Sequence, residues 1–472
     1  MHTKISALSV VILLTSAVFS LPSGDGNEIR QQASSEELQD VERVSAKNPE
    51  QIHLAYTGEI DSMFVTWSTL LDAEKGSATF FSKGTSPKTV EASKTPLVHT
   101  DELNGKYLTR TTYTYRATMR PLLPHTTYTY FVRNGLRESE SFNFTTFPNS
   151  TSEDPFLPRL TIYGDMGAVN HVSLAKIQQD LDKKNFDMII HIGDFAYDMN
   201  GFLGGKGDLF MNEIQSVAAR VPYNVAVGNH EHHNNFSEFA GRFTGPAPSV
   251  FYHSFNVGPL HIIMFSAEFY FFINFGTEQL QAQYNWIVED LARANTKEAR
   301  EAQPWIVAMA HRPMYCSSLS PLAACTKEDN PMRLGIESNS TRLYELEQLF
   351  LENGVDLQFY AHEHNYERLL PIYQYKYEQV ANTSEYKDPI YPVQVITGSA
   401  GCREFRGFFR YPKPDWSVFR TNEYGFTRLK VKDRLTIQLE QYSIEQAKVV
   451  DKFTVSKSGN YPNFGVGKPD RF

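Results

Sequence analysis

The sequence predicts a protein of two domains, in which an all-β sandwich is followed by a larger α/β domain. The chain has 472 residues, more than a single hydrophobic core usually serves. Between residues 51 and 147, apolar and polar residues alternate in short segments such as 64–67 and 112–115, a pattern typical of half-buried antiparallel strands. After residue 159, short segments rich in Ile and Val alternate with segments of helical periodicity, which favours an α/β domain with the strands inside.

The N-terminus resembles a secretory signal peptide. Residues 1–20 combine a positive charge at Lys4, an apolar stretch over 5–18 and small residues suited to cleavage. The apolar stretch is short for a membrane span, so a retained N-terminal anchor is the weaker alternative. Residues 21–48 are polar and charged and are expected to form a mobile leader.

The β-sandwich is predicted over residues 49–147, about the hundred residues that an immunoglobulin-like or fibronectin-III-like module needs. Aromatic residues such as Trp67 and Tyr115 are expected in its core. A linker rich in Pro and Ser follows over residues 148–158. The expected strands span residues 52–57, 63–68, 108–119, 127–133 and 140–147.

The α/β domain is predicted over residues 159–456, and residues 457–472 form a tail. Gly354 is expected to end the last predicted helix. The glycine-rich stretch 201–207 lacks the spacing of a phosphate-binding P-loop and is expected to be an ordinary loop. Helices are predicted at 172–183, 278–294 and 341–353, and strands that complete a sheet at 427–431, 435–441 and 449–455.

Five apolar segments of the second domain each end on residues that can bind a metal ion. Because ligands bind at the carboxyl ends of the strands in α/β sheets, we expect these side chains to lie together. With Tyr197, which follows closely after the second segment, the set is too large for one tetrahedral zinc ion. It suits two ions that together hold a phosphoryl group. The strand-end residues are Asp165, Asp194, Asn229, His230, His311, His362 and His364.

Charge and cysteine content limit the partners and the compartment. The chain has 45 Lys+Arg against 54 Asp+Glu and a net charge of −9, which argues against nucleic-acid and anionic-membrane partners. Cys316 and Cys325 are expected to pair in an oxidising compartment, which leaves Cys402 free or intermolecular. These features predict a secreted, lysosomal or other lumenal protein of the secretory pathway. N-glycosylation sequons occur at Asn143, Asn149, Asn235, Asn339 and Asn382.

The strand-end motifs resemble, in order, the five blocks of the purple acid phosphatases, above all the long two-domain form of plants and animals. The resemblance covers about residues 49–455 and implies a fibronectin-III-like domain followed by a calcineurin-like metallophosphoesterase domain, an α+β sandwich. The blocks are Gly-Asp-Met-Gly at 164–167, Gly-Asp-Phe-Ala-Tyr at 193–197, Gly-Asn-His-Glu at 228–231, Ala-Met-Ala-His at 308–311 and Ala-His-Glu-His at 361–364.

The resemblance also implies the roles of single residues. Asp165, Asp194, Tyr197 and His364 would hold a ferric ion. Asp194, Asn229, His311 and His362 would hold a divalent zinc, manganese or iron ion, with Asp194 as the bridge. The Tyr197 phenolate would give the colour of the family. His230 would bind the phosphoryl group or protonate the leaving group. The implied activity is hydrolysis of small phosphate monoesters at acid pH by metal-activated hydroxide.

Two positions depart from the family pattern. Ala361 replaces the usual glycine, which would cost about 1 kcal/mol if the position needs a positive φ. Plant members carry pocket histidines after the residue matched by His311, whereas Arg312 and Tyr315 occupy that segment here, and either could contact substrate.

Two other functions stay open beside the phosphomonoesterase. The first is a phosphodiesterase or nucleotide phosphohydrolase of the same superfamily, since the ligands alone do not set the substrate. The second is a secreted interaction glycoprotein with an inactive phosphatase domain. The loss of a metal ligand would favour this second reading, and the sequence retains every one.

Overall fold

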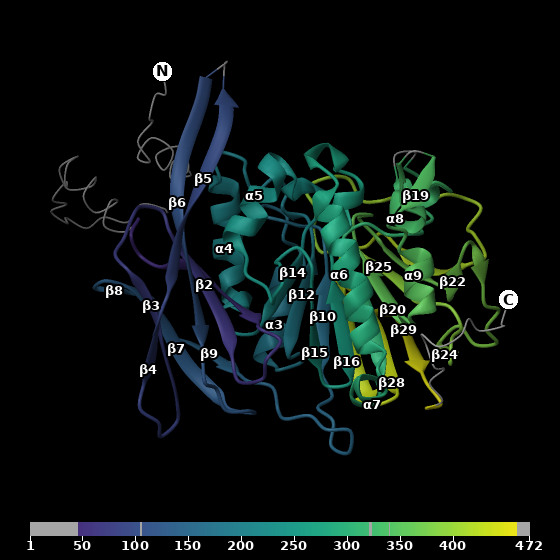
Figure 1. The fold of residues 1–472 in the computed structure, drawn as a ribbon, viewed down its shortest axis with the longest axis horizontal. Helices are drawn as coiled ribbons and strands as arrows, with labels where there is room; N and C mark the ends of the chain where they lie inside the picture. Colours follow the sequence, from purple (N-terminus) through teal and green to yellow (C-terminus); the bar gives the residue numbers. More distant parts are fainter. Residues whose placement is uncertain (1–45, 104–105, 321–322, 339, 460–472) are drawn as a thin grey trace, which may run out of the picture.

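A computed structural model describes residues 46–103, 106–320, 323–338 and 340–459. The predicted signal peptide, nearly all of the predicted leader, Asn339 and most of the predicted tail lie outside the described residues. Figure 1 shows the β-sandwich at one side of the molecule, packed against a larger domain of strands and helices. This order of an all-β domain before an α/β domain confirms the predicted fold class.

The N-terminal sandwich has two antiparallel sheets. Trp67, Tyr115 and Tyr130 are fully buried between them, as their place in alternating strands predicts. The first sheet has the order β1 (Glu50–Tyr56), β2 (Met63–Thr69), β6 (Lys106–Met119) and β5 (Ser93–Leu103). The second has the order β4 (Lys88–Glu91), β3 (Gly76–Ser82), β7 (Thr127–Asn134) and β8 (Arg137–Glu138), with β9 (Phe142–Thr145) also paired to β7.

Strands β3, β4 and β5 were not predicted from the sequence. They carry many Ser, Thr and Lys residues, and Pro96 lies within β5. Both β4 and β5 are edge strands, where polar residues and proline are tolerated because one edge needs no partner.

The second domain is built on two seven-stranded sheets. One has the order β14 (Tyr223–Ala226), β12 (Met188–Ile192), β10 (Arg159–Tyr163), β27 (Gly425–Asp433), β28 (Thr436–Ser443), β29 (Lys448–Ser456) and β24 (Glu385–Lys387). The other has the order β15 (His253–Val257), β16 (Leu260–Met264), β17 (Trp305–Met309), β20 (Leu357–Tyr360), β25 (Val393–Thr397), β21 (Tyr366–Leu369) and β26 (Ser417–Thr421). Because β27 pairs with β10, the C-terminal strands complete a sheet of this domain, as predicted.

Alternate residues of the central strands serve two cores. Ile190 of β12 and Val307 of β17 belong to one apolar cluster between the sheets. Their neighbours Ile189 and Ile306 belong to a second cluster, which also contains residues of the helices. Strands buried on both faces explain the continuous runs of Ile and Val in the sequence.

The helices pack on the outer faces of these sheets, as Figure 1 shows for α4 and α6. They are α3 (Leu174–Asp182), α4 (Gly205–Ala218), α5 (His233–Arg242), α6 (Glu278–Ala294), α7 (Lys297–Ala302), α8 (Pro331–Leu334) and α9 (Glu347–Glu352). The predictions for 172–183 and 278–294 agree with α3 and α6. Short two-stranded pairs join β11 (Met166–Gly167) to β13 (Phe195–Ala196), β18 (Ile336–Ser338) to β19 (Thr341–Leu343), and β22 (Ile372–Tyr373) to β23 (Lys376–Tyr377).

Two of the predicted elements are wrong in part. The helix predicted over 341–353 begins only at Glu347, since Thr341–Leu343 forms an exposed strand, β19, paired with β18. Leu346 and Phe350 are buried, but no apolar residue at 341 or 342 extends that buried face. The loop predicted over 201–207 ends early, because α4 begins at Gly205.

The two domains meet along β1 and the helices α4 and α5. Main-chain amides of Gln51 and Ile52 donate to the side chains of Asn212 and Gln215 on α4, at 3.2 and 2.8 Å. A buried ionic cluster lies beside them, in which Arg242 of α5 donates to Asp208 of α4 at 2.8 Å. In the described part of the chain, the helices are all too short or too polar to cross a membrane.

Candidate metal centre

The structure brings all the predicted site residues to one edge of the two central sheets. Asp165 follows β10, Asp194 follows β12, and Asn229 with His230 follows β14. From the second sheet, His311 follows β17, and His362 with His364 follows β20. The parallel strands therefore bring their carboxyl ends together, as the sequence predicts.

The first group of these residues consists of Asp165, Asp194 and His364, whose ligand atoms all lie within 4.8 Å of one another. Tyr197 belongs to the same group. Its Oη is 2.9 Å from His364 Nε2 and 3.4 Å from Asp165 Oδ1. The Tyr197 side chain is fully buried, so its hydroxyl has its partners inside the centre.

The second group consists of Asp194, His311 and His362, whose ligand atoms also lie within 4.8 Å of one another. His311 Nε2 is 3.2 Å from Asp194 Oδ2 and 3.2 Å from Asn229 Oδ1. The two groups share Asp194. One carboxylate between two sets of ligands is the arrangement that a pair of bridged metal ions requires.

Hydrogen bonds orient the histidines for metal binding. His311 Nδ1 donates to the carbonyl of Ile192 at 2.8 Å, and His364 Nδ1 donates to the carbonyl of Phe405 at 3.0 Å. Because a carbonyl oxygen only accepts, the proton is on Nδ1 in both rings and Nε2 faces the centre. The donor set of carboxylates, imidazoles, an amide and a phenol suits transition-metal ions.

The loops that carry the ligands adopt backbone conformations that are uncommon for side-chain-bearing residues. Asp165, Asp194, Tyr197 and His362 all have positive φ, between 55° and 66°. Strain of this kind costs about 1–3 kcal/mol per residue and concentrates at functional sites. The loop at residue 228 lies so close to Asp194 that only glycine fits there, because a Cβ on Gly228 would lie 2.3 Å from Asp194 Oδ1.

His230 lies at the rim of the centre and is held by Asp198. His230 Nδ1 donates to Asp198 Oδ1 at 2.8 Å, which leaves Nε2 4.0 Å from Asp194 Oδ2 and 3.5 Å from Glu404 Oε1. Burial lowers the pKa of His230, but the Asp198 hydrogen bond and the nearby carboxylates outweigh it and raise the pKa to about 9. The hydrogen bond to Asp198 occupies Nδ1, so Nε2 is the ring nitrogen of His230 that faces the centre.

Sequence reasoning missed two acidic residues that shape the site. Glu231 is buried and accepts hydrogen bonds from the main-chain amides of Asp194, Phe195 and Gly228, at 3.0, 2.9 and 2.9 Å. It thereby joins two ligand-bearing loops. Asp198 orients His230. Both lie inside or next to the recognised motif blocks, so the blocks were a signal for them, but their contacts depend on the tertiary fold.

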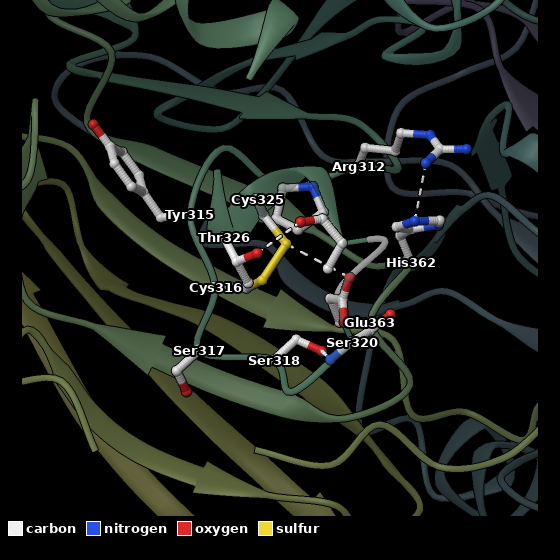
Figure 2. Close-up of a disulfide and its surroundings, with 12 residues drawn as sticks. Arg312, Tyr315, Cys316, Ser317, Ser318, Ser320, Cys325, Thr326, His362 and Glu363 are labelled. Carbon is white, nitrogen blue, oxygen red and sulfur yellow. Dashed lines mark hydrogen bonds between the residues drawn. A yellow bond between two sulfur atoms is a disulfide. The ribbon is translucent and has the colours of Figure 1, made fainter. Parts of the chain in front are cut away.

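Arg312 and Tyr315 lie in different environments. Arg312 Nη1 is 3.0 Å from His362 Nε2, and Figure 2 shows this contact beside the disulfide. Tyr315 is 2% exposed and packs against the guanidinium of Arg333, 4.4 Å from its ring centroid. In Figure 2 its ring points away from Arg312 and His362. Of the two residues considered as substrate contacts, only Arg312 lies at the centre.

The cysteines behave as the sequence predicts. Cys316 and Cys325 form a disulfide, and Cys402 is free and buried. The disulfide lies against Glu363, whose Oε1 is 3.5 Å from Cys325 Sγ (Figure 2). Glu363 stands between the two histidines of the last motif block, so the disulfide supports the segment that carries them.

A pocket of about 650 Å³ opens beside the two groups of ligands. His362, His364 and Arg312 form one part of its lining. Leu319, Phe405 and Phe408 form another part, and these residues are 60%, 92% and 61% exposed. Large apolar side chains left in solvent beside a pocket are a common mark of a binding site.

Comparison with known proteins agrees with this geometry. Models of the purple acid phosphatase N-terminal domain, of calcineurin-like phosphoesterases and of the iron/zinc purple acid phosphatase-like protein C match residues 49–146, 158–366 and 391–452. Acid phosphatase type 7 of Mus musculus is 40% identical over 88% of this chain and 92% of its own. A relative from Arabidopsis thaliana named "Probable inactive purple acid phosphatase 1" is 31% identical over 73% of this chain and 58% of its own.

Among solved structures, purple acid phosphatase PPD1 from yellow lupin (Lupinus luteus) seeds has the same fold. It superposes with a TM-score of 0.70 at 24% identity and covers 89% of this chain and 76% of its own. The first family model covers the β-sandwich, and the other two follow one another within the second domain. The chain therefore belongs to the purple acid phosphatase family, a family of metal-dependent phosphatases with dinuclear centres.

Proposed function

We propose that the protein is an acid phosphatase that hydrolyses small phosphate monoesters at a centre of one ferric ion and one divalent zinc, manganese or iron ion. Asp165, Asp194, Tyr197 and His364 would hold the ferric ion. Asp194, Asn229, His311 and His362 would hold the divalent ion. When bound, the two ions supply a hydroxide at acid pH and neutralise the charge of the phosphoryl group.

The observation that carries this proposal is the position of Tyr197. Its buried hydroxyl lies 2.9 Å from His364 Nε2 and 3.4 Å from Asp165 Oδ1, inside only one of the two ligand groups. A phenolate is a ligand suited to ferric iron, whereas the amide of Asn229 and the imidazoles of the other group suit a divalent ion. The asymmetry of the two groups therefore supports a mixed pair.

The chain's own residues supply the remaining chemistry. His230 directs Nε2 toward the centre, where the protonated ring would donate to the leaving-group oxygen. Asp198 fixes the ring by accepting from Nδ1 at 2.8 Å. The exposed apolar residues Leu319 and Phe405 leave room for the organic part of the substrate in the adjoining pocket.

Secretion or delivery to the lumen of the secretory pathway is part of the proposal. Of the predicted glycosylation sites, the described asparagines Asn143, Asn149, Asn235 and Asn382 are all exposed, as the attachment of a glycan requires. The Cys316–Cys325 disulfide suits the same compartment. Recovery of an N-terminally processed, glycosidase-sensitive protein from the medium of expressing cells would support this, and retention of the unprocessed chain in the cytosol would contradict it.

The test of the activity uses the full-length protein purified from a secretory host. We expect about two metal ions per chain, at least one of them iron, and a broad visible absorption band. We also expect faster hydrolysis of p-nitrophenyl phosphate than of bis(p-nitrophenyl) phosphate at acid pH. Faster cleavage of the diester would support the phosphodiesterase alternative. A metal-replete protein that hydrolyses neither ester would support the alternative of an interaction glycoprotein with an inactive phosphatase domain.

A further inference from the structure

The Arg312 side chain is fixed in place next to two predicted ligands of the divalent ion. It follows His311 in the chain, and its Nη1 is 3.0 Å from Nε2 of His362 (Figure 2). Its Nε donates to both carboxylate oxygens of Glu268, at 3.0 and 2.8 Å, and Glu268 is fully buried. The guanidinium also stacks on Phe271, 4.5 Å from the ring centroid.

These contacts fix the orientation of the guanidinium through its Nε and one of its faces. Because Nε is held by Glu268 and one face by Phe271, the Nη atoms remain at the end of the side chain that lines the pocket with His362 and His364. The side chain is 16% exposed and lines this pocket. An arginine held in this way is preorganised to bind a planar or tetrahedral anion.

Metal binding at His362 would remove the acceptor that Arg312 now uses. If His362 ligates a metal ion through Nε2, the lone pair of that nitrogen is used, and if it ligates through Nδ1, Nε2 carries the ring proton; in either case Nε2 no longer accepts a hydrogen bond from Arg312. The Nη1 donor would then need another acceptor close to the divalent ion. A cationic donor left without an acceptor in a half-buried position is costly.

We infer that Arg312 binds a phosphoryl oxygen of the substrate on the divalent-metal side of the centre. This inference rests on the proposed function and deepens it, since it assigns to this chain a phosphate contact in the segment after His311. A non-bridging phosphoryl oxygen offers an anionic acceptor to the Nη1 donor, which loses its acceptor once His362 is ligated. Arg312 would hold the same oxygen in the product phosphate.

The pocket provides a matched control, Arg406. This residue also lines the pocket, but its Nη2 lies 2.7 Å from Glu445 Oε1 and its guanidinium stacks 4.1 Å from the ring centroid of Tyr424. Arg406→Gln removes one positive charge from the same pocket without removing a donor beside His362. A general effect of charge would appear in both variants.

The experiment measures binding of inorganic phosphate to the metal-replete full-length protein by titration calorimetry, with metal content determined on the same samples. We expect Arg312→Gln to keep both metal ions and to raise the phosphate Kd about tenfold to a hundredfold, because a charge-assisted hydrogen bond is lost. Arg312→Lys keeps the charge and a partner for Glu268, and it should lie between wild type and Arg312→Gln. Arg406→Gln should change the Kd by less than about twofold.

Steady-state kinetics with p-nitrophenyl phosphate add a second readout. Arg312→Gln should raise KM and the inhibition constant of phosphate together. Unchanged phosphate binding in a metal-replete Arg312→Gln protein would overturn the inference, and so would an equal effect of Arg406→Gln. It would also be overturned if wild type holds one metal ion and Arg312→Gln gains a second, because Arg312 would then exclude the metal rather than bind substrate. A wild-type protein that binds phosphate but hydrolyses no ester would contradict the proposed function. The effect of Arg312→Gln on the phosphate Kd would still test the role of Arg312.

Discussion

The methyl group of Ala361 fills the space beside Gly164, and a Cβ built on Gly164 would lie only 2.4 Å from the Cβ of Ala361. In the described part of the chain, the residues with positive φ include His362, at 66°, but not Ala361. The cost of about 1 kcal/mol considered for an alanine at this position therefore does not arise. Ala361 is compatible with the site because its neighbour across the sheets is glycine.

This contact predicts the effect of Gly164→Ala. The new methyl group would collide with Ala361 and approach the carbonyl of Ile192 to 3.1 Å, so the loops that carry Asp165 and His362 would have to separate. We expect a loss of stability of about 1–3 kcal/mol, as for other overpacked sites, together with reduced metal content. Thermal unfolding and metal analysis measure both effects.

A second substitution tests whether the collision is the cause. Adding Ala361→Gly to Gly164→Ala removes the opposing methyl group and should restore most of the stability and the metal content. If the double variant is no better than Gly164→Ala, the steric explanation is wrong.

Tyr197→Phe is expected to remove the visible colour of the metal-replete protein. The hydroxyl of Tyr197 is the only atom that the substitution deletes, and it lies 2.9 Å from His364 Nε2 inside the proposed ferric site. Since Asp165, Asp194 and His364 remain as ligands, iron should stay bound and much of the activity should persist. Absorption spectra at equal iron content measure the effect, and a variant that keeps the band would assign the colour to another residue.

His311→Ala should empty the divalent site and abolish activity. His311 Nε2 lies 3.2 Å from both Asp194 Oδ2 and Asn229 Oδ1, so its loss leaves this group without a central imidazole. Metal analysis should find about one ion fewer per chain than in wild type. His232→Ala is the control, because His232 is exposed and stacks on Phe272 outside the ligand groups. An active His311→Ala protein with both ions would contradict the ligand assignment.

Local sequence patterns were sufficient to predict the strands that carry the site and the residues at their carboxyl ends. Runs of Ile and Val buried on both faces identify strands such as β12 and β17, and Asp194 and His311 lie two residues beyond the carboxyl ends of these strands. That is why the sequence places Asp194 and His311 in one centre. The helix predicted over 341–353 starts too early, because the spacing of apolar residues alone does not show where a helix stops packing against the core.

Contacts between distant segments lay beyond local patterns. Asp198 and His230 come from different strand ends, and their hydrogen bond depends on how β12 and β14 pair. The contact between Arg312 and His362 likewise joins β17 to β20. Helix α4 was missed because it begins with Gly205, Lys206 and Gly207, a poor helix start that packing against the sheet and β1 outweighs.

The interface between the domains predicts a dependence of stability on pH. Asp208 accepts from Arg242 at 2.8 Å and from Gln51 at 3.1 Å, and it also pairs with Arg110 of the sandwich. Burial raises the pKa of Asp208, but the charges of Arg242 and Arg110 outweigh it and lower the pKa from 3.8 to about 2. The charged form therefore stabilises the fold at pH values above 3.8, and this contribution is lost as the pH falls from 3.8 toward 2.

Asp208→Asn should lower the free energy of unfolding by about 3–5 kcal/mol near neutral pH, because Arg242 would remain buried without its full charge partner. The difference from wild type should narrow as the pH falls from 3.8 toward 2, because the unfolded wild-type chain takes up a proton at Asp208 in this range, whereas the folded chain does so only near pH 2. Thermal or denaturant unfolding at several pH values measures it. Asp182→Asn is the control, since Asp182 pairs with Arg220 at 2.9 Å but its side chain is 64% exposed. This exposed pair should contribute less than about 1 kcal/mol at any pH. An Asp208→Asn variant that behaves like the control would show that the ionic cluster does not hold the domains together.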